Sequence, residues 1–243
     1  MAEKYSDDNM IHTLQSLRFI FIMLVVLSHY IGSSFDFGGE CGVSFFFMLS
    51  GFVLSLAYSE RISKGLFSTK PFCVKQWIKI YPLHIITFII MFALDLRLEK
   101  YCEPEAAIAN LLLLQSWVPA DSFYFVVNSP SWFLCDIMFF YVVFSSLNKL
   151  ILRVDNIRLY SISLFVFLLY ICLMVVLPSS LVNPVLYANP LTRLLDFIIG
   201  IILFKLYISD KGIALKDKLV KKSSFVVSSM EFSLILLIVV TAI

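Results

Sequence analysis

A short apolar stretch near the start of the chain carries the two side chains best suited to chemistry. Arg18 and His29 stand 11 residues apart. At about 100° per residue this spacing returns to nearly the same helix face, about 16 Å further along the axis. A neutral imidazole has a reference pKa of about 6.5 and can take a proton from a hydroxyl nucleophile. An arginine and a histidine that reach toward opposite membrane surfaces would show the same spacing, and spacing alone favours this structural interpretation.

Other polar side chains interrupt later apolar runs, where ionisable groups are costly and therefore candidates for function. Asp136 lies early in one such run, where a carboxylate could orient His29 or a sugar hydroxyl. Arg193 and Asp196 stand three residues apart, so they can pair within one helix, which lowers the cost of holding both in a membrane. Ser50 can hydrogen-bond a neighbouring helix, although its glycine-containing segment has helix packing as its default role.

A basic pair precedes another apolar run. Lys75 and Lys79 lie four residues apart, on one face of a helix. They are suited to bind the phosphates of a nucleotide-bearing donor, although anionic lipid headgroups are the commoner partner of such a pair. The five cysteines are scattered singly and form no metal-ligand cluster, so the sequence predicts no metal site.

The composition indicates that these residues stand in a membrane. The chain is 60% hydrophobic and 15% charged, with a mean hydropathy of +0.92, whereas soluble domains are about half apolar and a quarter charged. The net charge of +2 gives no reason to expect a nucleic-acid partner. Membrane lipids are therefore the expected surroundings, and the sequence predicts an all-α, polytopic helix bundle.

The apolar runs define the expected helices, because a spanning helix needs about 20 mainly apolar residues. The sequence predicts a single membrane domain over residues 1–243, with about seven crossings. A short run at 106–118 is expected to form an interfacial or re-entrant helix. The crossings are expected at residues 17–31, 42–58, 77–94, 132–150, 159–177, 191–208 and 225–243.

The loop charges predict an orientation. Lysine and arginine gather in the segments 61–79, 149–158 and 205–222, whereas the loops 32–41 and 178–190 contain neither. Because cytoplasmic loops carry the excess of these residues, the pattern alternates consistently if the short run does not cross. The N-terminus is then cytoplasmic, and it has no features of a cleaved signal peptide.

Five segments match a known family pattern in the family's order. Together they resemble the acyltransferase 3 family, bacterial integral membrane enzymes that acylate sugars of surface polysaccharides and related glycans. The similarity runs from residue 14 to about 208, and each segment alone is a weak signal. The segments are the Arg18-x10-His29 pattern, GVSFFFMLSGF (42–52), KIYPLH (79–84), SWFL…FFY (131–141) and PLTRLLDFIIG (190–200).

The resemblance implies a function and assigns roles. It implies an acyl-CoA donor, commonly acetyl-CoA, presented from the cytoplasm, and a lipid-linked or polymeric carbohydrate acceptor. The location would be the bacterial inner (plasma) membrane, and no bound cofactor is implied. His29 would be catalytic, Arg18 essential beside it, and Lys75 and Lys79 would lie in the donor-binding region.

Three departures from the family pattern bear on these roles. Lys79 stands where arginine is usual, which removes bidentate phosphate recognition. Many members have glutamate at the position of Ile137, and Asp136 points about 100° away from it. Members have about ten spans, so the last spans are expected to be missing from this chain. A transporter and an inactive, truncated acyltransferase therefore remain alternatives, although the paired broken helices of a transport site are absent from the sequence.

Overall fold

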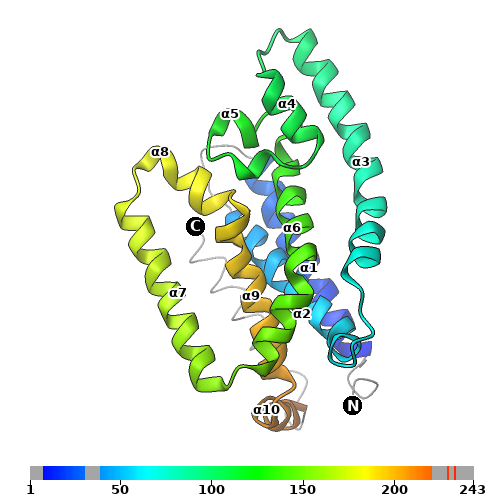
Figure 1. Ribbon diagram of the computed structural model, residues 1–243, viewed down its shortest axis with the longest axis vertical. Coiled ribbons are helices and arrows are strands. Elements are labelled where there is room, and N and C mark those ends of the chain that lie inside the picture. Colours follow the sequence, from blue (N-terminus) through cyan, green and yellow to red (C-terminus); the bar gives the residue numbers. More distant parts are fainter. Residues whose placement is uncertain (1–7, 31–38, 221–228, 230–232, 234–243) are drawn as a thin grey trace. The chain divides into compact units, whose positions relative to one another are not determined.

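The computed structural model describes residues 8–30, 39–220, 229 and 233, and within them the chain is helical with no β-strand (Figure 1). This confirms the all-α prediction. The α-helices are α1 (Asp8–Tyr30), α2 (Gly39–Ser63), α3 (Thr69–Arg97), α4 (Pro104–Leu111), α5 (Asp121–Tyr124), α6 (Trp132–Arg153), α7 (Asn156–Val176), α8 (Ser179–Val182), α9 (Pro190–Tyr207) and α10 (Asp210–Val220). Between them lie the 3-10 turns η3 (Gln115–Trp117) and η4 (Ser129–Ser131) and a π-helical turn, η5 (Asn183–Tyr187).

Four of these helices are long and apolar enough to cross a membrane. They are Cys41–Ser63, Thr69–Arg97, Ser129–Arg153 and Ile157–Val176, and they coincide with the second to fifth predicted crossings. The helix α4 has eight residues and is too short to span, which agrees with the predicted interfacial or re-entrant helix.

The remaining three predicted crossings do not coincide with described helices of this length and hydropathy. The first coincides with α1, whose apolar part is the shorter stretch Leu17–His29. The sixth coincides with α9, whose 18 residues include the charged Arg193, Asp196 and Lys205. Of the seventh, at 225–243, only residues 229 and 233 are described, so this prediction is not tested.

By packing, the chain divides into two compact units, residues 1–60 with 199–243, and residues 61–198. In the first unit, α1 and α2 run antiparallel with very close backbones. The rings of Phe21 and Phe45 stack with centroids 3.9 Å apart. A Cβ atom added at Gly42 would come within 3.1 Å of the Phe21 carbonyl oxygen. Small residues permit this approach between membrane helices, so Gly42 has the packing role expected of its segment.

Gly200 brings α9 equally close to α2 within the same unit. A Cβ atom at this position would lie 1.9 Å from the carbonyl oxygen of Met48 and 2.9 Å from the amide nitrogen of Phe52. Beside this contact, Phe52 meets Phe204 edge to face, with ring centroids 6.0 Å apart. Because the atoms that face Gly200 belong to the backbone, no side-chain rotation can make room for a larger residue.

Replacing Gly200 by alanine is therefore expected to lower the free energy of unfolding by about 1–3 kcal/mol, the usual cost of overpacking. Thermal unfolding in detergent, followed by loss of the monodisperse species, would measure the change. The neighbouring Ile199 is half-exposed, and Ile199→Ala should change stability by less than about 0.5 kcal/mol. An equal effect of both variants would contradict the close approach of α2 and α9.

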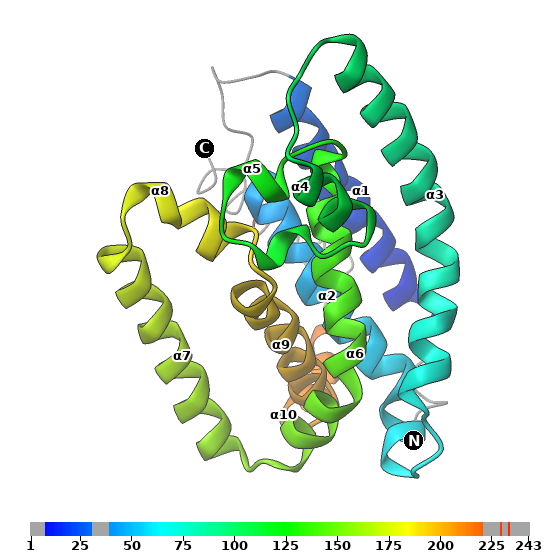
Figure 2. The ribbon, with the colours of Figure 1, turned by 45° about the horizontal axis from the view of Figure 1, so that its top comes forward.

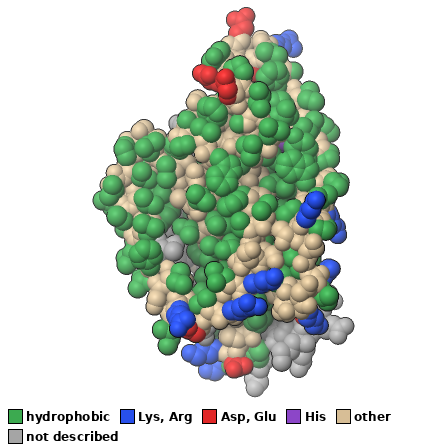
Figure 3. All heavy atoms as spheres, viewed as in Figure 1, with side chains coloured by type: hydrophobic (Ala, Val, Ile, Leu, Met, Phe, Trp, Pro, Cys, Tyr) green, Lys and Arg blue, Asp and Glu red, His purple; other side chains and the backbone are tan. Residues whose placement is uncertain are grey.

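In the second unit, α3 and α6 pack side by side around a core of Leu113, Cys135 and Met138. The segment from α4 to η4 lies over the end at which α6 begins (Figure 2). Lysine and arginine side chains gather toward the opposite end, where α3 begins and α6 ends (Figure 3). The two ends of this unit thus differ in charge, and the orientation in the membrane stays a prediction.

Candidate functional site

His29 stands in the last turn of α1 with its side chain exposed. Its Nδ1 atom lies 2.7 Å from the carbonyl oxygen of Val25, one helical turn earlier. A carbonyl oxygen can only accept a hydrogen bond, so Nδ1 is the donor and carries the proton. In the neutral ring Nε2 then holds the free lone pair. The imidazole is therefore held in the tautomer that can act as a base through Nε2.

The Val25 carbonyl oxygen accepts a second side-chain hydrogen bond. The hydroxyl of Ser28 donates to it at 2.8 Å, so the serine and histidine share one acceptor. The group that fixes the imidazole is thus part of the backbone of its own helix. Within α1 the imidazole is therefore oriented without a carboxylate, and the two roles expected of Asp136 stay predictions.

Arg18 and His29 both lie on α1, and their spacing places them on one face, about 16 Å apart along the axis. The guanidinium and the imidazole consequently start from different levels of the helix. Ser50, on α2, donates its hydroxyl to the Phe46 carbonyl of its own helix at 2.8 Å. That bond is local, and a substrate contact for Ser50 stays a prediction.

Asp136 belongs to the second unit and is fully buried in α6. Neither of its carboxylate oxygens has a hydrogen-bond partner. The nearby Ser116 donates instead to the carbonyl of Trp132 at 3.2 Å, and the positive charge that acts on the carboxylate is Arg193. A buried polar group normally has a partner, so each one without a partner needs an explanation. Asp136 can accept hydrogen bonds at two positions.

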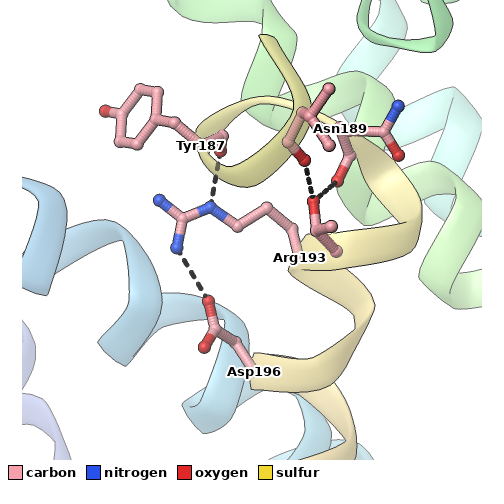
Figure 4. Close-up of polar contacts among 6 residues, drawn as sticks. Tyr187, Asn189, Arg193 and Asp196 are labelled. Carbon is pink, nitrogen blue, oxygen red and sulfur yellow. Dashed lines mark hydrogen bonds and ion pairs between the residues drawn. The ribbon is translucent and has the colours of Figure 1, made fainter. Parts of the chain in front are cut away.

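Arg193 joins the first turn of α9 to the π-helical turn before it (Figure 4). Its Nε donates to the Tyr187 carbonyl at 2.5 Å, and its Nη1 pairs with Asp196 at 3.0 Å. The guanidinium also lies over the Tyr187 ring, 4.8 Å from the centroid. Arg193 is buried and the Asp196 side chain is 20% exposed, so the pairing predicted from the i, i+3 spacing is confirmed as a largely buried ion pair.

A buried polar network around His84 was not predicted from the sequence. The Nε2 atom of His84 lies 3.0 Å from the Asn110 carbonyl, and its Nδ1 lies 3.4 Å from the amide nitrogen of Asn128. The same nitrogen donates to the Thr87 hydroxyl at 2.9 Å. His84 thus donates through Nε2 and accepts at Nδ1, which is the opposite tautomer to that of His29. Both of its nitrogens are engaged, so it is a packed histidine and not a base.

The network continues from α4 to the start of α6. The Asn110 amide donates to the Val126 carbonyl at 2.9 Å, the Ser131 hydroxyl lies 3.3 Å from the Asn110 side-chain oxygen, and Gln115 donates to Ser131 at 3.0 Å. These bonds join the parts of the segment over α6, and the bond between His84 and Asn110 ties that segment to α3. One feature of the sequence could have indicated this network, namely the amide side chains in and around a short apolar run. Burying an amide costs free energy unless it forms hydrogen bonds.

The basic pair and the cysteines complete the candidate groups. Lys75 and Lys79 are exposed on α3, at the end of the second unit where basic residues gather. Burial and then the charge of Asp95 raise the pKa of the Cys102 thiol, so this thiol stays protonated at neutral pH and is a poor nucleophile. Within the described residues no group of three metal-ligating side chains occurs.

Comparison with known proteins identifies the family. An acyltransferase domain, that of the acyltransferase 3 family, matches residues 11–239. The acyltransferase MdmB of Streptomyces mycarofaciens is 30% identical over 182 residues, which are 68% of this chain and 46% of that protein. The chain thus spans less than half the length of this relative. No solved structure matches the chain. The family match covers nearly the whole chain, and the chain therefore belongs to the acyltransferase 3 family.

Proposed function

We propose that this protein transfers an acyl group, expected to be acetyl, from acyl-CoA to a hydroxyl of a cell-envelope carbohydrate. The observation that carries the proposal is the tautomer of His29, whose Nδ1 is bound to the Val25 carbonyl and whose exposed side chain offers Nε2 as a base. Membership of the acyltransferase 3 family supports the reaction type. The proposed location is the bacterial inner membrane, with the N-terminus in the cytoplasm.

The proposed reaction uses this base. Nε2 of His29 takes the proton of the acceptor hydroxyl as its oxygen attacks the thioester carbonyl carbon. The new C–O bond forms, the C–S bond breaks, and the departing thiolate takes the proton from the imidazolium. Arg18, at the other level of the same helix face, is proposed to hold negative charge of the donor.

The test is transfer of label from acetyl-CoA labelled in the acetyl group to envelope glycan, in membranes that contain the protein. Alkali-labile label on the glycan supports an O-acyltransferase. Glycan flux into vesicles without any acyl donor would instead support the transporter alternative. No transfer by a protein that is folded and inserted would support the inactive alternative.

Lys75 and Lys79 are proposed to bind the phosphates of the donor. Reversing both charges in Lys75→Glu/Lys79→Glu is expected to raise the KM for acyl-CoA about threefold to tenfold at low salt and to leave kcat nearly unchanged. Because salt screens exposed charges, the rise in KM should be smaller at about 0.5 M salt. Steady-state kinetics at two salt concentrations would measure both values.

The control is Lys149→Glu/Arg153→Glu, which changes the net charge equally at exposed positions near the end of α6. It should leave the KM within about twofold of the wild type. An equal rise in both variants would mean that the whole basic end attracts the donor and that α3 holds no specific site.

A further inference from the structure

The packing of α2 on α1 reaches the residue next to His29. Residues 21, 25 and 28 of α1 face residues 45, 42 and 39 of α2. Spacings of three and four residues keep each set on one face of its helix. At the end of this stripe, a Cβ atom added at Gly39 would lie 2.2 Å from Oγ of Ser28 and 3.0 Å from its Cβ. Gly39 is the residue that leaves room for the Ser28 side chain as it stands.

The position of the Ser28 hydroxyl affects the oxygen that holds the imidazole. The hydroxyl donates to the Val25 carbonyl at 2.8 Å, and His29 Nδ1 donates to the same oxygen at 2.7 Å. Two donors on one carbonyl share its electron density, so each hydrogen bond is weaker than it would be alone. The serine therefore moderates how strongly the Nδ1–H bond polarises the ring.

We propose that Gly39 and Ser28 are positioning residues for His29. Gly39 provides the space in which the Ser28 hydroxyl folds back onto the Val25 carbonyl, and the hydroxyl then sets the strength of the bond that orients the imidazole. The proposal rests on the proposed function only in taking His29 as the base. The hydrogen bonds themselves can be tested without any acyl transfer.

A methyl group at position 39 is expected to displace the Ser28 hydroxyl, since rotation about its Cα–Cβ bond is the simplest relief of a 2.2 Å contact. Displacement leaves the Val25 carbonyl to His29 alone. Ser28→Ala removes the same donor directly. The two substitutions should consequently strengthen the hydrogen bond from His29 Nδ1 to the Val25 carbonyl by the same amount. The double variant should strengthen it no further.

The experiment is NMR of the full chain in detergent, with 15N-labelled histidine and the His29 signal assigned by its loss in a His29→Asn variant. Both Gly39→Ala and Ser28→Ala are expected to shift the Nδ1 proton of His29 downfield. Both should also slow its exchange with water severalfold. The double variant should match either single variant.

Gly42→Ala is the matched control, because its methyl group meets the Val25 side chain at 2.6 Å and the Phe21 carbonyl at 3.1 Å, and not Ser28. It should leave the Nδ1 proton shift unchanged. The proposal is overturned if Gly42→Ala shifts this proton as Gly39→Ala does, or if the effects of Gly39→Ala and Ser28→Ala add. The acyltransfer proposal fails by a different result. It is contradicted if a His29→Asn enzyme keeps full activity, whatever shift of the Nδ1 proton the other variants show.

Discussion

Replacement of His29 by asparagine is expected to lower the rate of acyl transfer about 100- to 10,000-fold, the usual contribution of a positioned acid–base group. Asparagine places an amide nitrogen close to the position of Nδ1, so it can keep the hydrogen bond to the Val25 carbonyl. It has no atom at the position of Nε2 and cannot take a proton. The exposed side chain contributes little packing, so the fold should be unaffected.

The measurement is kcat with labelled acetyl-CoA, together with thermal unfolding of the same preparation. The matched control is His84→Gln, since His84 is buried with both ring nitrogens engaged. This variant should lower thermal stability and retain kcat in the folded fraction. An active His29→Asn protein would remove His29 as the base, whereas loss of kcat in folded His84→Gln would transfer a catalytic role to the second histidine.

Replacement of Arg193 by leucine is expected to reduce the free energy of unfolding by about 3–5 kcal/mol, as when one partner of a buried ion pair is removed. Asp196 would lose its counter-charge, the Tyr187 carbonyl would lose its donor, and Asp136 would lose the positive charge that acts on it. Lysine should fall between arginine and leucine, because it keeps the charge and loses the planar fork that makes two bonds at once.

The double variant Arg193→Leu/Asp196→Leu separates the charge pair from its surroundings. Replacing both partners by apolar residues of similar size is often nearly neutral, so this variant should recover the part of the loss that comes from the unpaired Asp196. The Tyr187 carbonyl and Asp136 still lack Arg193, so the recovery should be incomplete. Thermal unfolding in detergent measures the recovery. If the double variant is stable and still transfers acyl groups, the pair holds α9 to the π-helical turn; stable protein without activity would place the pair in substrate binding.

The sequence was sufficient to predict those features that depend on the length or hydropathy of a segment or on residue spacing along one helix. Four predicted crossings coincide with long apolar helices, because a bilayer demands about 20 apolar residues wherever a helix spans it. The Arg193–Asp196 pair was predicted for the same kind of reason, since residues three apart on a helix are neighbours. The placement of Arg18 and His29 on one face of α1 likewise follows from helix periodicity.

The sequence was insufficient where the hydrogen-bond partner of a side chain is a backbone group or belongs to a distant segment. The acceptor of the His29 proton is the carbonyl of Val25, and no side-chain identity reveals which carbonyl a histidine will use. The bonds from His84 to Asn110 and Asn128 join residues 26 and 44 positions apart. A one-dimensional pattern cannot anticipate that pairing. The role of Gly39 depends on the Ser28 side chain that faces it, and the sequence does not show which residues face each other.

The use of a backbone carbonyl to hold His29 has a consequence for how this protein can change over time. In enzymes that orient the histidine with a carboxylate, two positions must mutate together, and that joint variation is visible in alignments. Here the acceptor persists whatever side chain occupies position 25, so long as α1 stays helical. A search for positions that co-vary with His29 is therefore expected to return the residues that shape its surroundings and to miss the group that holds it.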